Sequence, residues 1–182
     1  MKVCVFCSSA NAINKKYKSY AVDFGKWLAD NDMSLVYGGA IGGLMDCVAK
    51  GASSKRASII GVVPQTIIDK GRLSLYPTQI FKVDSMNNRK SMMKQLSDVF
   101  VVFPGGFGTL DEWFDVYASL IVGEHNKPIF VFNPDNYWQG IKMQFDKFEE
   151  EGTGARKSVK KSLKFFENLD DLKNELISIN NK

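Results

Sequence analysis

The sequence predicts a doubly wound α/β fold, in which a mainly parallel sheet is covered by helices on both faces. Three observations support this prediction. Apolar runs of strand length recur along the chain, amphipathic helical patterns fall between them, and glycine-rich loops follow two of the runs. With 182 residues, of which 45% are hydrophobic and 24% charged, the chain is expected to form one domain over residues 1–182.

The expected strands are mostly continuous apolar runs rather than alternating ones. This pattern is typical of strands that are covered on both faces, as in parallel sheets. In chain order, the expected strands are Val3–Cys7, Ser34–Tyr37, Ser58–Val63, Gln79–Val83, Val99–Phe103 and Ile129–Asn133.

Between and after these runs, apolar residues recur at helical spacing and predict six amphipathic helices. The segment Glu149–Lys164 is the loosest part of the chain, and we interpret its basic stretch, residues 156–164, as a solvated face rather than an anion site. The six apolar faces are formed by Tyr17, Ala21, Phe24 and Leu28; Leu44, Val48 and Ala52; Met86, Met93 and Leu96; Trp113, Val116, Tyr117, Leu120 and Ile121; Trp138, Ile141, Phe145 and Phe148; and Leu169, Leu172 and Leu176.

Composition and charge exclude several classes of protein. A formal net charge of +4 is compatible with an anionic small molecule but is far from the dense basic surface of a nucleic-acid binder. No apolar run approaches the ~20 residues that span a membrane, and the N-terminus lacks a signal peptide pattern. We therefore expect a cytoplasmic protein that binds neither nucleic acid nor membrane.

The three cysteines do not predict a disulfide or a metal site. Cys4 and Cys7 form a C-x-x-C pair, but Cys4 lies inside an expected strand, where a separation of three directs the two side chains to opposite faces. A redox motif needs its first cysteine at a helix N-terminus. With a single histidine, His125, and no cluster of ligands, a catalytic zinc site is not expected.

The first glycine-rich loop, VYGGAIGGLMDCVA, follows the strand that ends at Tyr37, and a helix is expected to begin near Leu44. Glycines let the backbone approach a ligand closely, and free N–H groups at a helix start favour an anion. The loop departs from the dinucleotide pattern G-x-G-x-x-G, because Ala40 occupies the third place. A phosphate site and a tight strand-to-helix turn are both open interpretations.

The segment DSMNNRKSMMKQL follows the fourth expected strand. Ser85, Asn87 or Asn88 can cap a helix that carries Arg89 and Lys90. Arg89 can be a surface residue, or it can reach the same crevice as the glycine loops.

The second glycine-rich loop lies in VFVVFPGGFGTLDEWF, where Pro104 ends the strand because it cannot donate to the ladder. Thr109 can cap a helix that starts at Leu110, and Thr109 to Glu112 matches a capping box, in which Glu112 reaches back to the cap N–H. The backbone of this loop is freed by three glycines, Gly105, Gly106 and Gly108.

Glu112 therefore has two interpretations, a helix cap or a functional acid. Two glycine loops at the carboxyl ends of strands imply a crevice of the kind in which doubly wound folds bind ligands. An acid in a phosphate pocket is repelled by the phosphate, so it must face another part of the ligand. In a nucleotide that part is the ribose.

Three motifs in order, YGGAIGGLMDCVA, SMNNRKSMM and PGGFGTLDE, resemble the LOG family of cytokinin-activating phosphoribohydrolases, which were long labelled lysine decarboxylases. The likeness runs from CVFCSS to GEHNKPIFVFNPDNYW, most of the chain. It implies one nucleotide-binding domain with a Rossmann-like fold, a homodimer, and no metal or redox cofactor. It also implies hydrolysis of the N-glycosidic bond of AMP or N6-modified adenosine 5′-monophosphates.

Matched by motif, Glu112 and Arg89 correspond to the family's catalytic pair. A carboxylate beside C1′ stabilises the positive charge that develops on the sugar and can activate water, while Arg89 keeps Glu112 ionised. The resemblance assigns substrate binding to Gly39, Gly42, Met86, Lys90, Gly105, Gly106, Gly108 and Thr109.

The chain departs from the family pattern at three places. Asn87 stands where the family often has histidine, Asp46 replaces the last glycine of G-L-M-G, and the segment QTIIDKGRLSLYPTQ after GVVP is altered. These departures leave the base preference open. Ribosyl transfer to a second base and non-catalytic nucleotide binding remain alternatives, whereas lysine decarboxylation would need a pyridoxal-binding lysine that no segment indicates.

Overall fold

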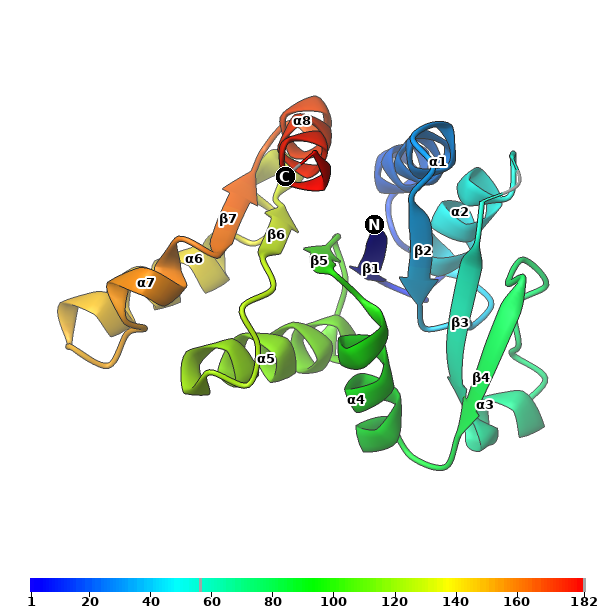
Figure 1. Ribbon diagram of the computed structural model, residues 1–182, viewed down its shortest axis with the longest axis horizontal. Coiled ribbons are helices and arrows are strands. Elements are labelled where there is room, and N and C mark those ends of the chain that lie inside the picture. The colour runs from blue at the N-terminus through cyan, green and yellow to red at the C-terminus, as the bar shows by residue number, and fades with distance from the viewer. Residues whose placement is uncertain (56, 182) are drawn as a thin grey trace.

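Seven parallel strands form one sheet in the part of the chain that the computed structural model describes, residues 1–55 and 57–181. The strand order is β4-β3-β2-β1-β5-β6-β7 (Figure 1). The strands are β1 (Lys2–Phe6), β2 (Ser34–Tyr37), β3 (Ile59–Pro64), β4 (Gln79–Val83), β5 (Val99–Val102), β6 (Ile129–Phe132) and β7 (Leu163–Phe166).

Helices cover both faces of the sheet, as Figure 1 shows. One face packs against α1, α2 and α8, and the other against α4, α5 and α6. The predicted doubly wound fold is thus confirmed. The helices are α1 (Lys15–Asp30), α2 (Gly43–Ala52), α3 (Gln65–Asp69), α4 (Met86–Leu96), α5 (Phe107–Val122), α6 (Gln139–Glu150), α7 (Lys157–Lys160) and α8 (Leu169–Asn180), with a 3-10 turn at Pro134–Asn136.

The alternation of side chains along β1 divides the core into two halves. Val3, Val5 and Cys7 contribute to the half beneath α1 and α2, whereas Cys4 and Phe6 contribute to the half beneath α4 and α5. The prediction that Cys4 and Cys7 point to opposite faces is therefore confirmed. Both are free and buried.

Strand order reverses at β1, which pairs with β2 on one side and with β5 on the other. The loops that leave the carboxyl ends of β1 and β5 therefore diverge onto opposite faces of the sheet, and a crevice opens between them. Ser8 N–H donates to Pro104 O across this point at 3.2 Å.

Besides the 3-10 turn, three elements were not predicted: the strand β7 and the short helices α3 and α7. β7 begins at the end of the segment that the sequence pattern marks as loose, and it is a half-exposed edge strand. Its order comes from pairing with β6, where Phe130 is opposite Lys164, and from the ring contact between Phe130 and Phe166. Order that comes from contacts with distant segments cannot be predicted from the local sequence pattern.

No helix within the described residues combines the length and the apolar character that crossing a membrane requires.

Candidate active site

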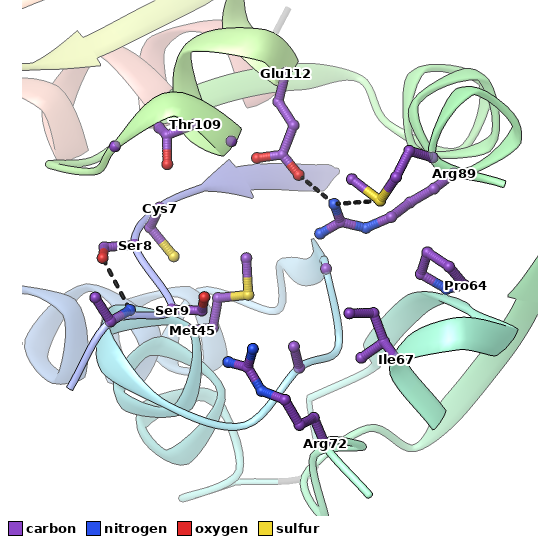
Figure 2. Close-up of a pocket in the computed structure, with 16 residues that line it drawn as sticks. Cys7, Ser8, Ser9, Met45, Pro64, Ile67, Arg72, Arg89, Thr109 and Glu112 are labelled. Atoms are coloured by element: carbon purple, nitrogen blue, oxygen red, sulfur yellow. Dashed lines mark hydrogen bonds and ion pairs between the residues drawn. The ribbon is translucent and has the colours of Figure 1, made fainter. Parts of the chain in front are cut away.

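A pocket with a volume of about 330 Å³ opens at the carboxyl ends of the central strands (Figure 2). Its walls come from the β1–α1 loop, the first glycine loop, the segment after β3, and the starts of α4 and α5. The lining residues are Cys7, Ser8, Ser9, Ala10, Gly38, Ala40, Met45, Pro64, Ile67, Arg72, Met86, Arg89, Gly106, Gly108, Thr109 and Glu112.

Glu112 of α5 and Arg89 of α4 form an ion pair at one wall of this pocket. Arg89 Nη1 lies 2.8 Å from Glu112 Oε1, and the two side chains are only 7% and 3% exposed. The oxygen has no directed hydrogen bond within the described residues. The contact is therefore a charge pair that leaves Oε1 able to accept a hydrogen bond. Figure 2 shows the carboxyl group turned toward Arg89 at the pocket.

The predicted capping box at Thr109 is wrong. The α5 helix begins two residues earlier than Thr109, at Phe107, and its N-cap is Gly106. Thr109 therefore lies inside the first turn, and Glu112 pairs with Arg89 instead of closing the helix end. Glycine is among the residues that are favoured at an N-cap, so Gly106 competes with Thr109 for this position.

Burial controls the ionisation of Glu112. Desolvation raises the pKa of the Glu112 carboxyl from its ordinary value of 4.5 to about 7, although the Arg89 guanidinium acts in the opposite direction and the nearby Asp111 raises it further. The prediction that Arg89 keeps Glu112 ionised is therefore correct in direction but outweighed by burial. At neutral pH the neutral and ionised forms coexist.

Arg89 is held in place by backbone on two sides. Its Nε donates to Val62 O at the end of β3, at 3.2 Å. A Cβ at Gly38 would lie 1.8 Å from Arg89 Nη2, so the absence of a side chain at Gly38 makes room for the guanidinium. The helix that carries Arg89 is capped by Ser85, whose side chain accepts from Asn88 N–H, as one of the predicted alternatives required.

The N-terminus of α5 presents amides that the described part of the protein does not use. Gly106 provides no side-chain cap, and the backbone N–H groups of the first helical turn, at Phe107, Gly108 and Thr109, donate to no acceptor within the described residues. Gly106, Gly108 and Thr109 line the pocket. The positive end of a 16-residue helix therefore faces the pocket with free donors.

The first glycine loop differs, because its amides are occupied. Gly42 N–H donates to Asp46 Oδ2 at 2.8 Å, and Gly43 N–H donates to Asn11 Oδ1 at 3.0 Å. The next two amides of α2 both donate to Ser8 O. The expectation that this helix start offers free N–H groups to an anion is therefore wrong.

Six of the ten predicted site residues line the pocket: Met86, Arg89, Gly106, Gly108, Thr109 and Glu112. The other four, Gly39, Gly42, Lys90 and Gly105, are not among its lining residues.

Two of these four residues have an unusual backbone conformation, and the other two bind neighbouring residues. Gly39 and Gly42 adopt positive φ angles of 64° and 110°. Lys90 Nζ binds Asp111 at 2.7 Å, and Gly105 O accepts from the Tyr137 hydroxyl at 2.8 Å. Their assignment to substrate binding stays a prediction.

Sequence reasoning missed the pocket residues of the β1–α1 loop and of the segment after β3. Ser8 and Ser9 follow β1 in CVFCSS, and Pro64 ends β3 in GVVP. Both places are the carboxyl ends of strands inside the sheet. Their position at a strand end could have indicated from the sequence that they line the pocket. Arg72 lies in a loop whose course toward the pocket no local pattern indicates.

Comparison with known proteins adds to this geometry. A family model described as "possible lysine decarboxylase" matches residues 45–176. The chain is 34% identical to cytokinin riboside 5′-monophosphate phosphoribohydrolase LOG3 of Arabidopsis thaliana, over 83% of this chain and 70% of that protein. It is 36% identical to the probable cytokinin riboside 5′-monophosphate phosphoribohydrolase LOGL2 of Oryza sativa subsp. japonica, over 83% of this chain and 62% of that protein. The chain thus spans less than two thirds of the rice protein.

Solved structures share the fold at low sequence identity. The molybdenum cofactor carrier protein of Chlamydomonas reinhardtii superposes with a TM-score of 0.75 at 16% identity, covering 100% of this chain and 98% of that chain. The molybdenum cofactor binding protein of Rippkaea orientalis gives a TM-score of 0.71 at 18% identity, covering 98% and 94%. At this level of identity the likeness shows the fold alone.

Proposed function

Because the chain belongs to the LOG family, whose model is described as "possible lysine decarboxylase", we propose that it hydrolyses the N-glycosidic bond of nucleoside 5′-monophosphates. AMP and N6-modified adenosine 5′-monophosphates are the proposed substrates, and a free base and ribose 5-phosphate are the products. The observation that carries the proposal is the buried Glu112–Arg89 pair beside a helix start with free amides.

The proposed substrate lies with its 5′-phosphate at the N-terminus of α5. Free backbone N–H groups and the helix dipole stabilise a phosphate dianion there, as they do at other helix starts. Glycine at positions 106 and 108 leaves open space, since a Cβ at either position would meet no atom within 4 Å. The phosphate does not react, but it fixes the position of the sugar.

Glu112 then faces the sugar from the first turns of the same helix. As the bond between C1′ and the base nitrogen breaks, its electron pair leaves with the base and positive charge develops on the sugar. The ionised carboxylate stabilises that charge and accepts a proton from the attacking water. The hydroxide adds to C1′, and the base takes up a proton, which balances the reaction.

Arg89 positions Glu112 and binds the sugar hydroxyls. Its guanidinium carries five donors, and the bond to Val62 O and the pair with Glu112 leave others for the ligand. Because only the ionised form of Glu112 accepts the proton, we expect the rate to rise with pH through about 7, the value to which burial raises the pKa of Glu112.

The test is incubation of the purified protein with AMP and with N6-isopentenyl-AMP, followed by chromatography of the released base. The wild type is expected to release adenine or the modified base together with ribose 5-phosphate. Glu112→Gln is expected to abolish release while calorimetry still detects nucleotide binding. Full activity of Glu112→Gln would contradict the assignment, and transfer to an added second purine would indicate a ribosyltransferase instead.

We also propose that the chain acts as a homodimer. Apolar side chains are exposed on the outer side of α5 and α6, and burying them would stabilise an association. Light scattering after size exclusion tests this proposal, and a monomeric mass would contradict it. The exposed side chains are Phe114, Ile121, Val122, Met143 and Phe148.

A further inference from the structure

Arg72 brings a positive charge into the pocket that the reaction scheme does not use. It lies between α3 and β4, and its side chain lines the pocket. Its backbone is fixed, because Arg72 N–H donates to Ile67 O and Arg72 O accepts from Ile41 N–H at 2.8 Å. The guanidinium donates once, from Nη2 to Ile41 O at 3.2 Å.

Within the described residues, no carboxylate forms an ion pair with the Arg72 side chain. Arg89, in contrast, is paired with Glu112. Figure 2 shows the Arg72 guanidinium directed toward Met45, on the side of the pocket away from Thr109 and Glu112. Four of the five N–H donors of Arg72 thus remain for a ligand.

The strand order gives a scale for the distance between Arg72 and the phosphate site. The α5 start follows β5, and Arg72 belongs to the segment that follows β3. In the sheet β5 and β3 are separated by β1 and β2, which is three spacings of about 4.8 Å each, or about 14 Å. A nucleotide with its phosphate at α5 therefore directs its base, and not its phosphate, toward Arg72.

The other residues at this end of the pocket have the character of a base site. Pro64 and Ile67 provide an apolar surface on which the flat face of a purine can pack, and Met86 borders it beside Arg89, with its Sδ 4.0 Å from Arg89 Nη1. Arg72 is then the polar group that meets the edge of the base. A guanidinium has donors and no acceptor, so it matches a base edge with adjacent acceptors and opposes an edge that carries an amino group.

We propose that Arg72 determines base specificity and favours a 6-oxopurine, which offers the acceptors O6 and N7, over adenine and its N6-substituted derivatives. This inference rests on the proposed function for its orientation of the ligand. It concerns the ranking of substrates and not the reaction. Arg72 lies in QTIIDKGRLSLYPTQ, the segment that departs from the family pattern.

The test compares inosine 5′-monophosphate, AMP and N6-isopentenyl-AMP as substrates of the wild type, Arg72→Leu and Lys70→Leu. Lys70 is an exposed cation two residues away that does not line the pocket, so it controls for charge. We expect kcat/KM of the wild type to be higher for the inosine nucleotide than for AMP by about tenfold, the value of one good bidentate contact. Arg72→Leu should remove this preference, and Lys70→Leu should retain it.

Binding measurements keep the inference testable if no base is released. Calorimetry with Glu112→Gln, alone and combined with Arg72→Leu, measures the affinities for the inosine nucleotide and AMP without turnover. A tenfold preference that Arg72→Leu abolishes supports the inference. A wild-type preference for AMP, or a ratio that Arg72→Leu leaves unchanged, overturns it. Binding with the expected preference but without hydrolysis would overturn the proposed function alone.

Discussion

The two glycine loops look alike in sequence but differ in what their glycines meet. Each loop follows a buried strand and opens a helix, α2 in the first case and α5 in the second. In the first loop, a Cβ at Gly43 would lie 2.6 Å from Ser8 O, and a Cβ at Gly42 would lie 2.6 Å from Ser9 O. In the second loop, a Cβ at Gly106 or Gly108 would meet no atom within 4 Å.

The two helix starts also differ in whether their first backbone amides have an acceptor within the protein. The first amides of α2 donate to Asp46, Asn11 and Ser8, all within the protein. The first amides of α5 have no acceptor in the described part of the chain. The first loop therefore satisfies its own amides. The α5 amides at Phe107 and Gly108 lie at exposed residues, open to solvent and, on the proposed function, to the phosphate.

The comparison shows that a glycine-rich strand-to-helix turn does not by itself indicate a phosphate site. Packing requires Gly42 and Gly43 in the first loop. In the second loop Gly105 is packed against Thr109, whereas Gly106 and Gly108 leave space. The acceptors that decide between the two come from elsewhere in the chain, as Asn11 and Ser8 do for α2. Three predictions test this distinction.

The largest effect is expected from Gly43→Ala in the first loop. Gly43 has a φ of 55°, and its Cβ would approach three backbone atoms of the β1–α1 loop within 2.8 Å. Because backbone cannot move away cheaply, we expect the free energy of unfolding to fall by about 3 kcal/mol or more, as measured by urea denaturation.

Gly71→Ala is the matched control for Gly43→Ala. Gly71 also has a positive φ, of 66°, but a Cβ there would meet nothing within 4 Å. Only the backbone strain then remains, which costs about 1 kcal/mol. Equal losses in the two variants would show that the first loop is not packed against the β1–α1 loop as described.

The next effect concerns the buried carboxyl group of the second loop. Below pH 4.5 Glu112 is neutral in both the folded and the unfolded chain, and its full contribution to stability is present. As the pH rises, the unfolded chain loses its proton first, and the contribution is lost through about pH 7, the value to which burial raises the pKa in the fold. The total loss is about 3 kcal/mol, from ~1.4 kcal/mol per pKa unit.

Glu112→Gln removes this titration. The free energy of unfolding of the variant, minus that of the wild type, should therefore increase between pH 4.5 and 7 and remain constant above. The test is the change of this difference with pH and not its absolute size, because Arg89 loses its charged partner in the variant and this shifts the free energy of unfolding at every pH. A flat profile for Glu112→Gln would mean that the pKa of Glu112 is not raised.

The fold could be predicted from the sequence because its signals are local. Runs such as Val99–Val102 are buried along their whole length, and this marks a central parallel strand. The strand β7 could not be predicted, since Leu163–Phe166 is ordered by pairing with β6 and by α8 rather than by its own pattern.

The site was predicted in part for the same reason. Gly106, Gly108 and Thr109 lie in one motif, and their place at a helix start follows from it. The opposite wall could not be predicted, because Arg72 is held at the pocket by bonds from its backbone and its guanidinium to Ile41, a residue distant in sequence. The ionisation of Glu112 was misjudged because burial depends on the whole fold and not on the nearest charge.

The smallest effect on stability, and a specific effect on binding, is expected from Gly108→Ala in the second loop. Gly108 is the second residue of α5, and alanine there gains helix propensity of at most about 1 kcal/mol without a clash. The added methyl group projects into the open space at the helix start and crowds the phosphate. We expect the affinity for AMP, measured by calorimetry in the Glu112→Gln background, to fall by about tenfold, or ~1.4 kcal/mol.

Gly140→Ala matches this change in every respect except the pocket. Gly140 is the second residue of α6, and a Cβ there also meets nothing within 4 Å, but it does not line the pocket. Its substitution should leave the affinity unchanged and alter stability as little as Gly108→Ala does. If Gly108→Ala bound AMP as tightly as Gly140→Ala, the free amides of α5 would not be the phosphate site. The two glycine loops would then differ in packing alone, and the open helix start would need another explanation.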